Sequence, residues 1–113
     1  MMKMLIGLDE KRIDADGYEP QSLWNWVDGL FAELKWTKET QPDGTVLYSG
    51  GLDNVNLFAD GFVIYRTFSS DTNFMKYCNK WLGFDNEDDE TLPLTEENYL
   101  EVAKNAKMNS LQG

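Results

Sequence analysis

The sequence predicts a single α+β domain in which an antiparallel meander sheet of four to five strands carries about three helices, packed mainly on one face. Short runs of β-branched and aromatic residues surround turn sequences between residues 36 and 68. Segments with apolar residues at helical spacing lie on both sides of that region. The chain has 113 residues, which suits one domain, residues 1–113, with one hydrophobic core.

The centre of the expected sheet is a β-hairpin whose strands, residues 54–59 and 62–68, flank Asp60-Gly61. An Asp-Gly pair suits the two-residue type I′ turn, because both turn positions need positive φ. The pairing places apolar side chains on one face, namely Val55, Leu57, Ala59, Phe62, Ile64 and Phe68. The other face combines amides with Phe58, Val63 and Tyr65 and is expected to be partly covered or to form a contact surface.

The N-terminal segment predicts a strand and a helix. Residues 4–8 form a short strand, which continues into irregular charged chain and a turn at residues 14–17. Pro20 opens the helix, because the N–H that proline lacks would have no partner in the first turn. The helix has an apolar stripe made by Leu23, Val27, Leu30, Phe31 and Leu34.

Two further elements surround the central hairpin. Residues 36–40 and 45–49 form a second hairpin, because Gln41-Pro42-Asp43-Gly44 between them is a typical turn sequence. After the central hairpin, residues 69–71 offer N-caps for a helix over residues 72–82, and Gly83 is expected to end it.

The last third of the chain is strongly acidic. Residues 85–101 contain no lysine or arginine and eight acidic residues: Asp85, Glu87, Asp88, Asp89, Glu90, Glu96, Glu97 and Glu101. Residues 85–94 are expected to form an acidic loop. Thr95 then caps a last helix that has Glu96 and Glu97 in its first turn, where the helix dipole favours them. Residues 109–113 are expected to fray.

The net charge of −10 limits the classes of partner that the chain is expected to bind. Such a chain repels nucleic acid and anionic membranes and attracts basic proteins. No apolar run reaches the roughly 18 residues of a membrane span, and the apolar N-terminal segment is too short for a signal peptide. The single cysteine, Cys78, cannot form an internal disulfide, so we expect a reducing, cytoplasmic location.

Enzymatic chemistry has little support in the sequence. The chain has no histidine, which excludes histidine-based nucleophile activation, acid–base catalysis and metal ligation. Cys78 lies on the inner face of its expected helix and is interpreted as a buried, inert thiol. An EF-hand loop starting at Asp85 would place Glu90 where glycine is required and Pro93 at the ninth position, so we expect no metal site. We therefore predict no catalytic residues and no cofactor.

The favoured hypothesis is a non-enzymatic module that binds a basic protein. In general character the chain is similar to bacterial immunity proteins and anti-defence inhibitors of bacteria and phages, which are small, acidic and aromatic-rich; this is a likeness of type, carried by no family motif. The expected contact residues are Asp85, Glu87, Asp88, Asp89, Glu90, Glu96, Glu97, Trp26, Trp36 and Tyr65.

Two alternatives stay open at this point. The first is a homodimer that forms through a sheet edge or through the face with Phe58, Val63 and Tyr65. The second is a carboxylate-based enzyme or ligand binder with a pocket between sheet and helices.

Overall fold

The computed structural model describes residues 1–51, 56–86 and 91–112, with only the backbone given for residues 108–112. Its described residues form one five-stranded antiparallel sheet in the order β2-β3-β1-β4-β5. The strands are β1 (Met2–Leu8), β2 (Thr37–Thr40), β3 (Val46–Gly50), β4 (Cys78–Asp85) and β5 (Thr95–Asn98). The helices are α1 (Glu10–Ala15), α2 (Pro20–Glu33), α3 (Leu57–Ser70), α4 (Thr72–Tyr77) and α5 (Tyr99–Gln112). The predicted α+β class with an antiparallel sheet is confirmed. The strands do not follow one another as in the predicted meander, because β1 lies between β3 and β4. The described residues form five helices where about three were predicted.

The N-terminal strand lies in the middle of the sheet. β1 pairs with β3 on one side and with β4 on the other, so that Met4 lies opposite both Tyr48 and Gly83. From β1 the chain passes through α1 and α2 to the β2–β3 hairpin, and then through α3 and α4 to β4. This connectivity is the split βαβ pattern, here extended by β5 and α5.

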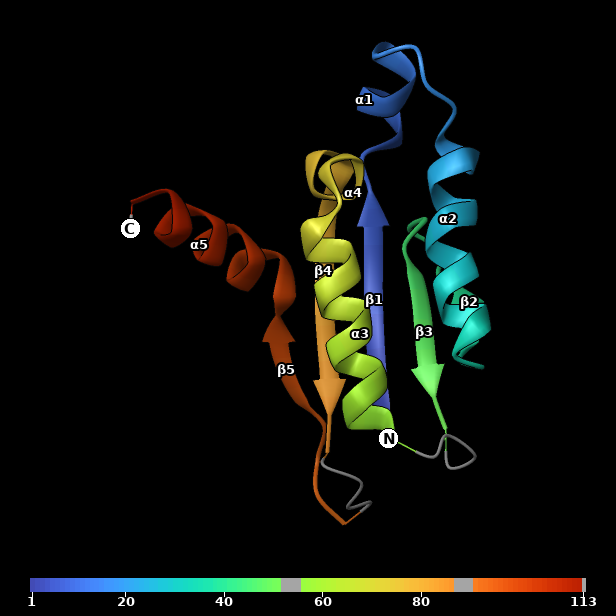
Figure 1. Cartoon of the computed structure of the whole chain (residues 1–113). Helices are drawn as coiled ribbons and strands as arrows, with labels where there is room; N and C mark the ends of the chain where they lie inside the picture. The colour runs from blue at the N-terminus through green and yellow to red at the C-terminus, as the bar shows by residue number, and fades with distance from the viewer. Residues whose placement is uncertain (52–55, 87–90, 113) are drawn as a thin grey trace.

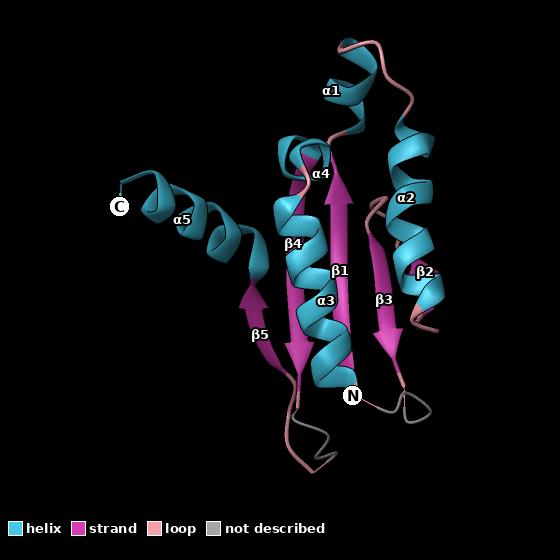
Figure 2. Ribbon diagram, viewed as in Figure 1, coloured by secondary structure: helices cyan, strands magenta, loops and turns pink. Residues whose placement is uncertain are grey.

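The two long central helices cover one face of the sheet. Figures 1 and 2 show α3 lying over β1 and β4, with α2 beside it toward β3 and β2. Along β1 and β3, buried side chains alternate with half-buried ones, because successive side chains of a strand point to opposite faces of the sheet. The side chains of Met4, Ile6, Tyr48 and Trp81 are buried against the helices. On the opposite face, Leu5 pairs across the strands with Leu47 and Leu82, and all three are half-buried.

Three predicted elements occur where expected, and the first is the N-terminal strand, which forms β1. α2 begins at Pro20 and buries Val27 and Phe31, with the other stripe leucines partly buried. The β2–β3 hairpin closes through the Gln41 N–H, which donates to the Thr45 carbonyl at 2.8 Å. Gly44 has φ +88° in this turn, a conformation that glycine adopts without strain.

The predicted central hairpin is wrong, because the region around Asp60-Gly61 is the helix α3. The Asn56 side chain caps this helix by accepting the Ala59 N–H at 3.0 Å. Gly61 is a packing residue rather than a turn residue, since a Cβ there would lie 2.9 Å from the Met2 sulfur. Within the expected hairpin strands, residues 54 and 55 lie outside the described residues.

The predicted helix over residues 72–82 is also wrong beyond residue 77. Asp71 caps α4 as expected, but the chain then extends and β4 pairs with β1 along its length. Gly83 ends no helix; it lies in β4 under the ring of Tyr99. Long-range pairing with β1 decides this segment, and local spacing carries no information about such pairing.

Two smaller differences concern residues 10–15 and the start of the last helix. Residues 10–15 form α1, capped by Asp9, where irregular chain was expected. Residues 95–98, the predicted start of the last helix with Thr95 as its cap, are instead the strand β5. α5 begins at Tyr99, with the Asn98 side chain accepting the Glu101 N–H at 3.1 Å. The backbone of α5 extends to Gln112, and fraying of residues 109–113 stays a prediction.

Candidate functional site

A cleft of about 300 Å³ opens where α1, the start of α2 and α4 meet. These elements lie together at one end of the molecule, at the top of Figure 1. The cleft is lined by Ile13, Tyr18, Glu19, Ser22, Leu23, Trp26, Asp71, Asn73 and Tyr77. Its volume is at the low end of ligand sites, so it suits one side chain or a small molecule rather than a large cofactor.

Aromatic side chains form much of the wall. The Trp26 ring contacts Phe68 and Phe74, with ring centroids 5.3 and 6.3 Å apart. This packing fixes the ring while 39% of Trp26 stays exposed. Tyr18, in the chain before α2, is 64% exposed. Partly exposed Trp and Tyr with a fixed orientation are typical anchors of binding surfaces.

Two carboxylates add negative charge to the cleft. Asp71 uses one carboxylate oxygen to accept the Phe74 N–H at 2.8 Å, which caps α4. Glu19 precedes Pro20, and its side chain makes no capping bond to α2. None of the described residues that line the cleft is basic. The lining therefore combines aromatic surface with two negative charges.

The Tyr77 side of the cleft is held by a polar cluster. The Tyr77 hydroxyl donates to Asp16 at 2.7 Å, and Lys76 lies 3.3 Å from the same oxygen. These two groups hold the pKa of Asp16 below its ordinary value of 3.8, the hydroxyl being the larger cause. Burial, followed by the hydrogen bond to Asp16, raises the pKa of Tyr77, which stays protonated. The cluster ties α4 to the turn after α1.

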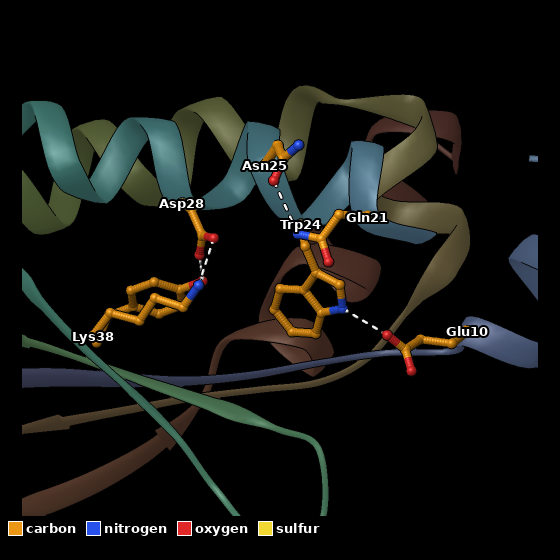
Figure 3. Close-up of polar contacts among 7 residues, drawn as sticks. Glu10, Gln21, Trp24, Asn25, Asp28 and Lys38 are labelled. Atoms are coloured by element: carbon orange, nitrogen blue, oxygen red, sulfur yellow. Dashed lines mark hydrogen bonds and ion pairs between the residues drawn. The ribbon is translucent and has the colours of Figure 1, made fainter. Parts of the chain in front are cut away.

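Other carboxylates satisfy donors of the core. Figure 3 shows Glu10 and Trp24 pointing toward one another, and the Trp24 indole N–H donates to Glu10 at 3.0 Å. In the same view Asp28 meets Lys38, with 2.7 Å between the charged atoms. Asp28 also accepts the hydroxyl of buried Tyr48, whose pKa is raised by burial and by this bond. These are structural contacts between α2 and its neighbours.

The structure separates the residues that the sequence predicted as contacts. Trp26 lies in the cleft as an exposed aromatic. Trp36 is buried, and its indole N–H donates to Asp60 at 3.0 Å, so its ring is not offered at the surface to a partner. Tyr65 is half-buried between Trp81 and Tyr99, with ring centroids 5.6 and 5.9 Å away. Trp26 lies in α2, Tyr65 lies in α3, and Trp36 lies in the chain just before β2.

The described members of the predicted acidic surface, Asp85, Glu96 and Glu97, lie far from Trp26. β4 starts directly after α4 and runs away from the cleft. The strand from Cys78 to Asp85 spans about 24 Å, which separates Asp85 from the cleft. Glu96 and Glu97 are exposed on β5, opposite Phe84 and Gly83. The remaining members of the acidic run, Glu87, Asp88, Asp89 and Glu90, lie outside the described residues.

Cys78 is buried, as expected, and burial raises the pKa of its thiol to about 12. A thiol in this state is a poor nucleophile at neutral pH.

Among the residues that the structure describes, no group of three or more potential metal ligands lies together. Within the same residues, no helix has the length and apolar character needed to cross a membrane.

Sequence reasoning missed most of the cleft. No pattern in the sequence marks Tyr18, Glu19 or Asn73, and the pattern at Asp71 predicts only a helix cap. They come from segments more than 50 residues apart, which the β1–β4 pairing brings together. The one available signal was Trp26, which lies at the flank of the apolar stripe of α2.

No protein-family model, no curated protein and no solved structure matches this chain. The site is therefore interpreted from its own geometry.

Proposed function

We propose that the protein is a non-enzymatic binding module that holds a basic side chain of a partner protein in the cleft between α1, α2 and α4. The observation that carries the proposal is the lining of that cleft. Exposed aromatic rings of Tyr18 and Trp26 lie beside the carboxylates of Glu19 and Asp71, and no basic residue lines the same cleft.

Arginine is the side chain that this lining suits best. Its planar guanidinium stacks on aromatic rings and donates to carboxylates at the same time. A cation over an exposed aromatic face contributes about 0.5–2 kcal/mol, and an exposed ion pair adds up to about 1 kcal/mol. The cleft alone would then give weak binding, and further contacts outside it would raise the affinity for a whole protein.

The overall charge of the chain supports a basic partner. A net charge of −10 speeds the approach of a positively charged protein, and the rate falls as salt is added. In this proposal Asp85, Glu96 and Glu97 steer the partner from the far end of the sheet. The acids of residues 87–90 add to the net negative charge of the chain. Such an arrangement suits an inhibitor that covers a basic surface of its target.

A peptide titration tests the cleft directly. The probe is acetyl-Gly-Gly-Arg-Gly-Gly-amide, compared with the same peptide carrying neutral citrulline in place of arginine. Amide chemical shifts of the protein report binding. We expect the arginine peptide to bind with a Kd of about 1 mM or weaker and to shift resonances around Trp26, since one cation–π contact and two ion pairs reach about −4 kcal/mol at their upper limits. The citrulline peptide should bind at least fivefold more weakly.

Two double variants with the same net charge provide the control. Glu19→Gln with Asp71→Asn removes both charges of the cleft, and asparagine at residue 71 still caps α4. Glu33→Gln with Glu39→Gln removes two exposed charges elsewhere. We expect the first pair to lose the preference for arginine and the second pair to keep it. Equal binding of both peptides by the unaltered protein, or equal losses in the two double variants, would contradict the proposal.

A second candidate function, self-association, is favoured by a different surface, the solvent face of α3.

A further inference from the structure

The helix α3 has an apolar solvent face. Phe58 is 81% exposed, Phe62 is 60% exposed and Val63 is 42% exposed. Ala59 and Arg66 are exposed on the same side. Phe58, Phe62 and Arg66 follow one another at four-residue spacing and so form a single ridge along the helix. We call these five residues the α3 ridge.

The fold of the described chain does not use this ridge. The opposite side of α3 buries Leu57, Ile64 and Phe68 against the sheet and α2. Figure 1 shows α3 lying over β1 and β4. The exposed fractions of the ridge residues place this side of the helix in solvent. Two large aromatic side chains on a solvent face weaken solubility without adding to the core, and apolar patches of this kind mark interaction surfaces.

The ridge is complementary to itself. We propose that it is a homodimer interface, in which the α3 helices of two copies cross antiparallel at Phe62. In a twofold arrangement centred on Phe62, that residue meets its own copy, and Phe58 of each chain meets Arg66 of the other, four residues away on either side. Packing of two four-residue ridges is the commonest helix–helix class. The guanidinium of Arg66 forms no ion pair with a described residue, so it is available to stack on the phenyl ring of Phe58.

The charge distribution favours a second copy on this face. Two chains with a net charge of −10 repel each other, so they associate best through a surface without carboxylates. The ridge has one positive charge, Arg66, and no exposed acid. The nearest acid of α3, Asp60, is half-buried and accepts the indole N–H of Trp36 at 3.0 Å.

The area suits a weak dimer. A fully exposed aromatic side chain offers about 200 Å², so the exposed fractions of Phe58, Phe62 and Val63 give about 350 Å² per copy. Two copies would bury about 700 Å² of these three side chains, and neighbouring residues bring the total near the roughly 1,000 Å² of the smallest specific interfaces. We therefore expect a Kd in the micromolar range.

Sedimentation velocity of the full chain between 1 and 200 μM tests the dimer. The unaltered protein should shift from monomer to dimer across this range. Phe62→Arg places two positive charges opposite each other at the crossing point and should raise the Kd at least about 100-fold. Leu92→Arg changes an exposed apolar residue outside the ridge and should leave the Kd within about twofold. Circular dichroism checks that both variants fold.

A disulfide assay fixes the position of the twofold axis. At helix–helix distances of 8–10 Å, opposing Cα atoms at the crossing point lie about 3.5–5.5 Å apart, which is within reach of a disulfide. Phe62→Cys should therefore give a crosslinked dimer under mild oxidation, whereas Leu92→Cys should not. The native Cys78 is buried and does not compete. A protein that stays monomeric at 200 μM, or a dimer that Phe62→Arg leaves intact, overturns the proposal.

Discussion

Replacing Gly83 by alanine tests how the C-terminal helix is anchored to the sheet. Gly83 lies in β4, opposite Met4 of β1 and Glu97 of β5. The ring of Tyr99, the first residue of α5, covers it. An added Cβ would lie 1.9 Å from one ring carbon of Tyr99 and 2.7 and 2.8 Å from two others. No atom pair tolerates such distances, so the ring must move.

The cost follows from the contacts of that ring. Tyr99 packs against Trp81 and Tyr65, with ring centroids 5.6 and 5.9 Å apart. Overpacking costs about 1–3 kcal/mol, and each displaced aromatic pair costs about 0.5–1.5 kcal/mol. Alanine is better than glycine in a strand by about 0.5–1 kcal/mol, which offsets part of this. We expect Gly83→Ala to lower the free energy of unfolding by about 2 kcal/mol.

Urea unfolding at 25 °C, followed by circular dichroism, measures the change. Gly29→Ala is the matched control, because Gly29 is in α2 and an added Cβ meets nothing within 4 Å. The same substitution there should stabilise the protein by about 0.5–1 kcal/mol, since alanine favours helix. In a Tyr99→Ala background the clash is absent, and Gly83→Ala should be neutral or slightly stabilising. An equal cost in both backgrounds would refute this account of α5.

Two further predictions concern titratable groups. Because burial raises the pKa of Cys78 to about 12, its thiolate fraction at pH 8 is on the order of one in 10,000, and the folded protein should react with a disulfide reagent at least about 100-fold more slowly than the urea-unfolded chain. The pKa of Asp16 is lower in the folded state than its ordinary value of 3.8, so its contribution to stability is present above that value and is lost as the pH falls through the folded pKa. Asp16→Asn should therefore have a lower urea midpoint than the unaltered protein at pH 7, and the two midpoints should converge near pH 2. Asp14→Asn alters a neighbouring exposed acid, and its urea midpoint should equal that of the unaltered protein at every pH.

Local chemistry was sufficient to predict the elements with their own start and stop signals. Pro20 marks the beginning of α2, and Pro42-Asp43-Gly44 marks the turn between β2 and β3. Asp71 caps α4 by the bond that its side chain suggests. In each case the decisive interaction lies within a few residues, so a single sequence contains it.

Elements that depend on distant partners could not be predicted in the same way. In α3, Asp60-Gly61 has the composition of a turn, but Asp60 satisfies the Trp36 indole and Gly61 allows close packing on Met2. In β4 the apolar residues recur at helical spacing, yet the segment forms a strand because it pairs with the free side of β1. The cleft could not be predicted for the same reason, because Trp26 and Asp71 are 45 residues apart in the sequence and line one cleft only in the tertiary fold.

The two proposals rest on separate parts of the helical layer and can fail independently. Phe62 precedes Asp71, which lines the cleft, by nine residues, and most of that distance is helix, or about 13 Å at 1.5 Å per residue. The ridge points away from the sheet, whereas Trp26 is held by Phe68 on the buried side of α3. A Phe62→Arg chain should thus remain a competent monomer for the arginine peptide. A dimer would present two such clefts on one particle, and a partner with repeated basic side chains would then be held more tightly than either cleft alone allows.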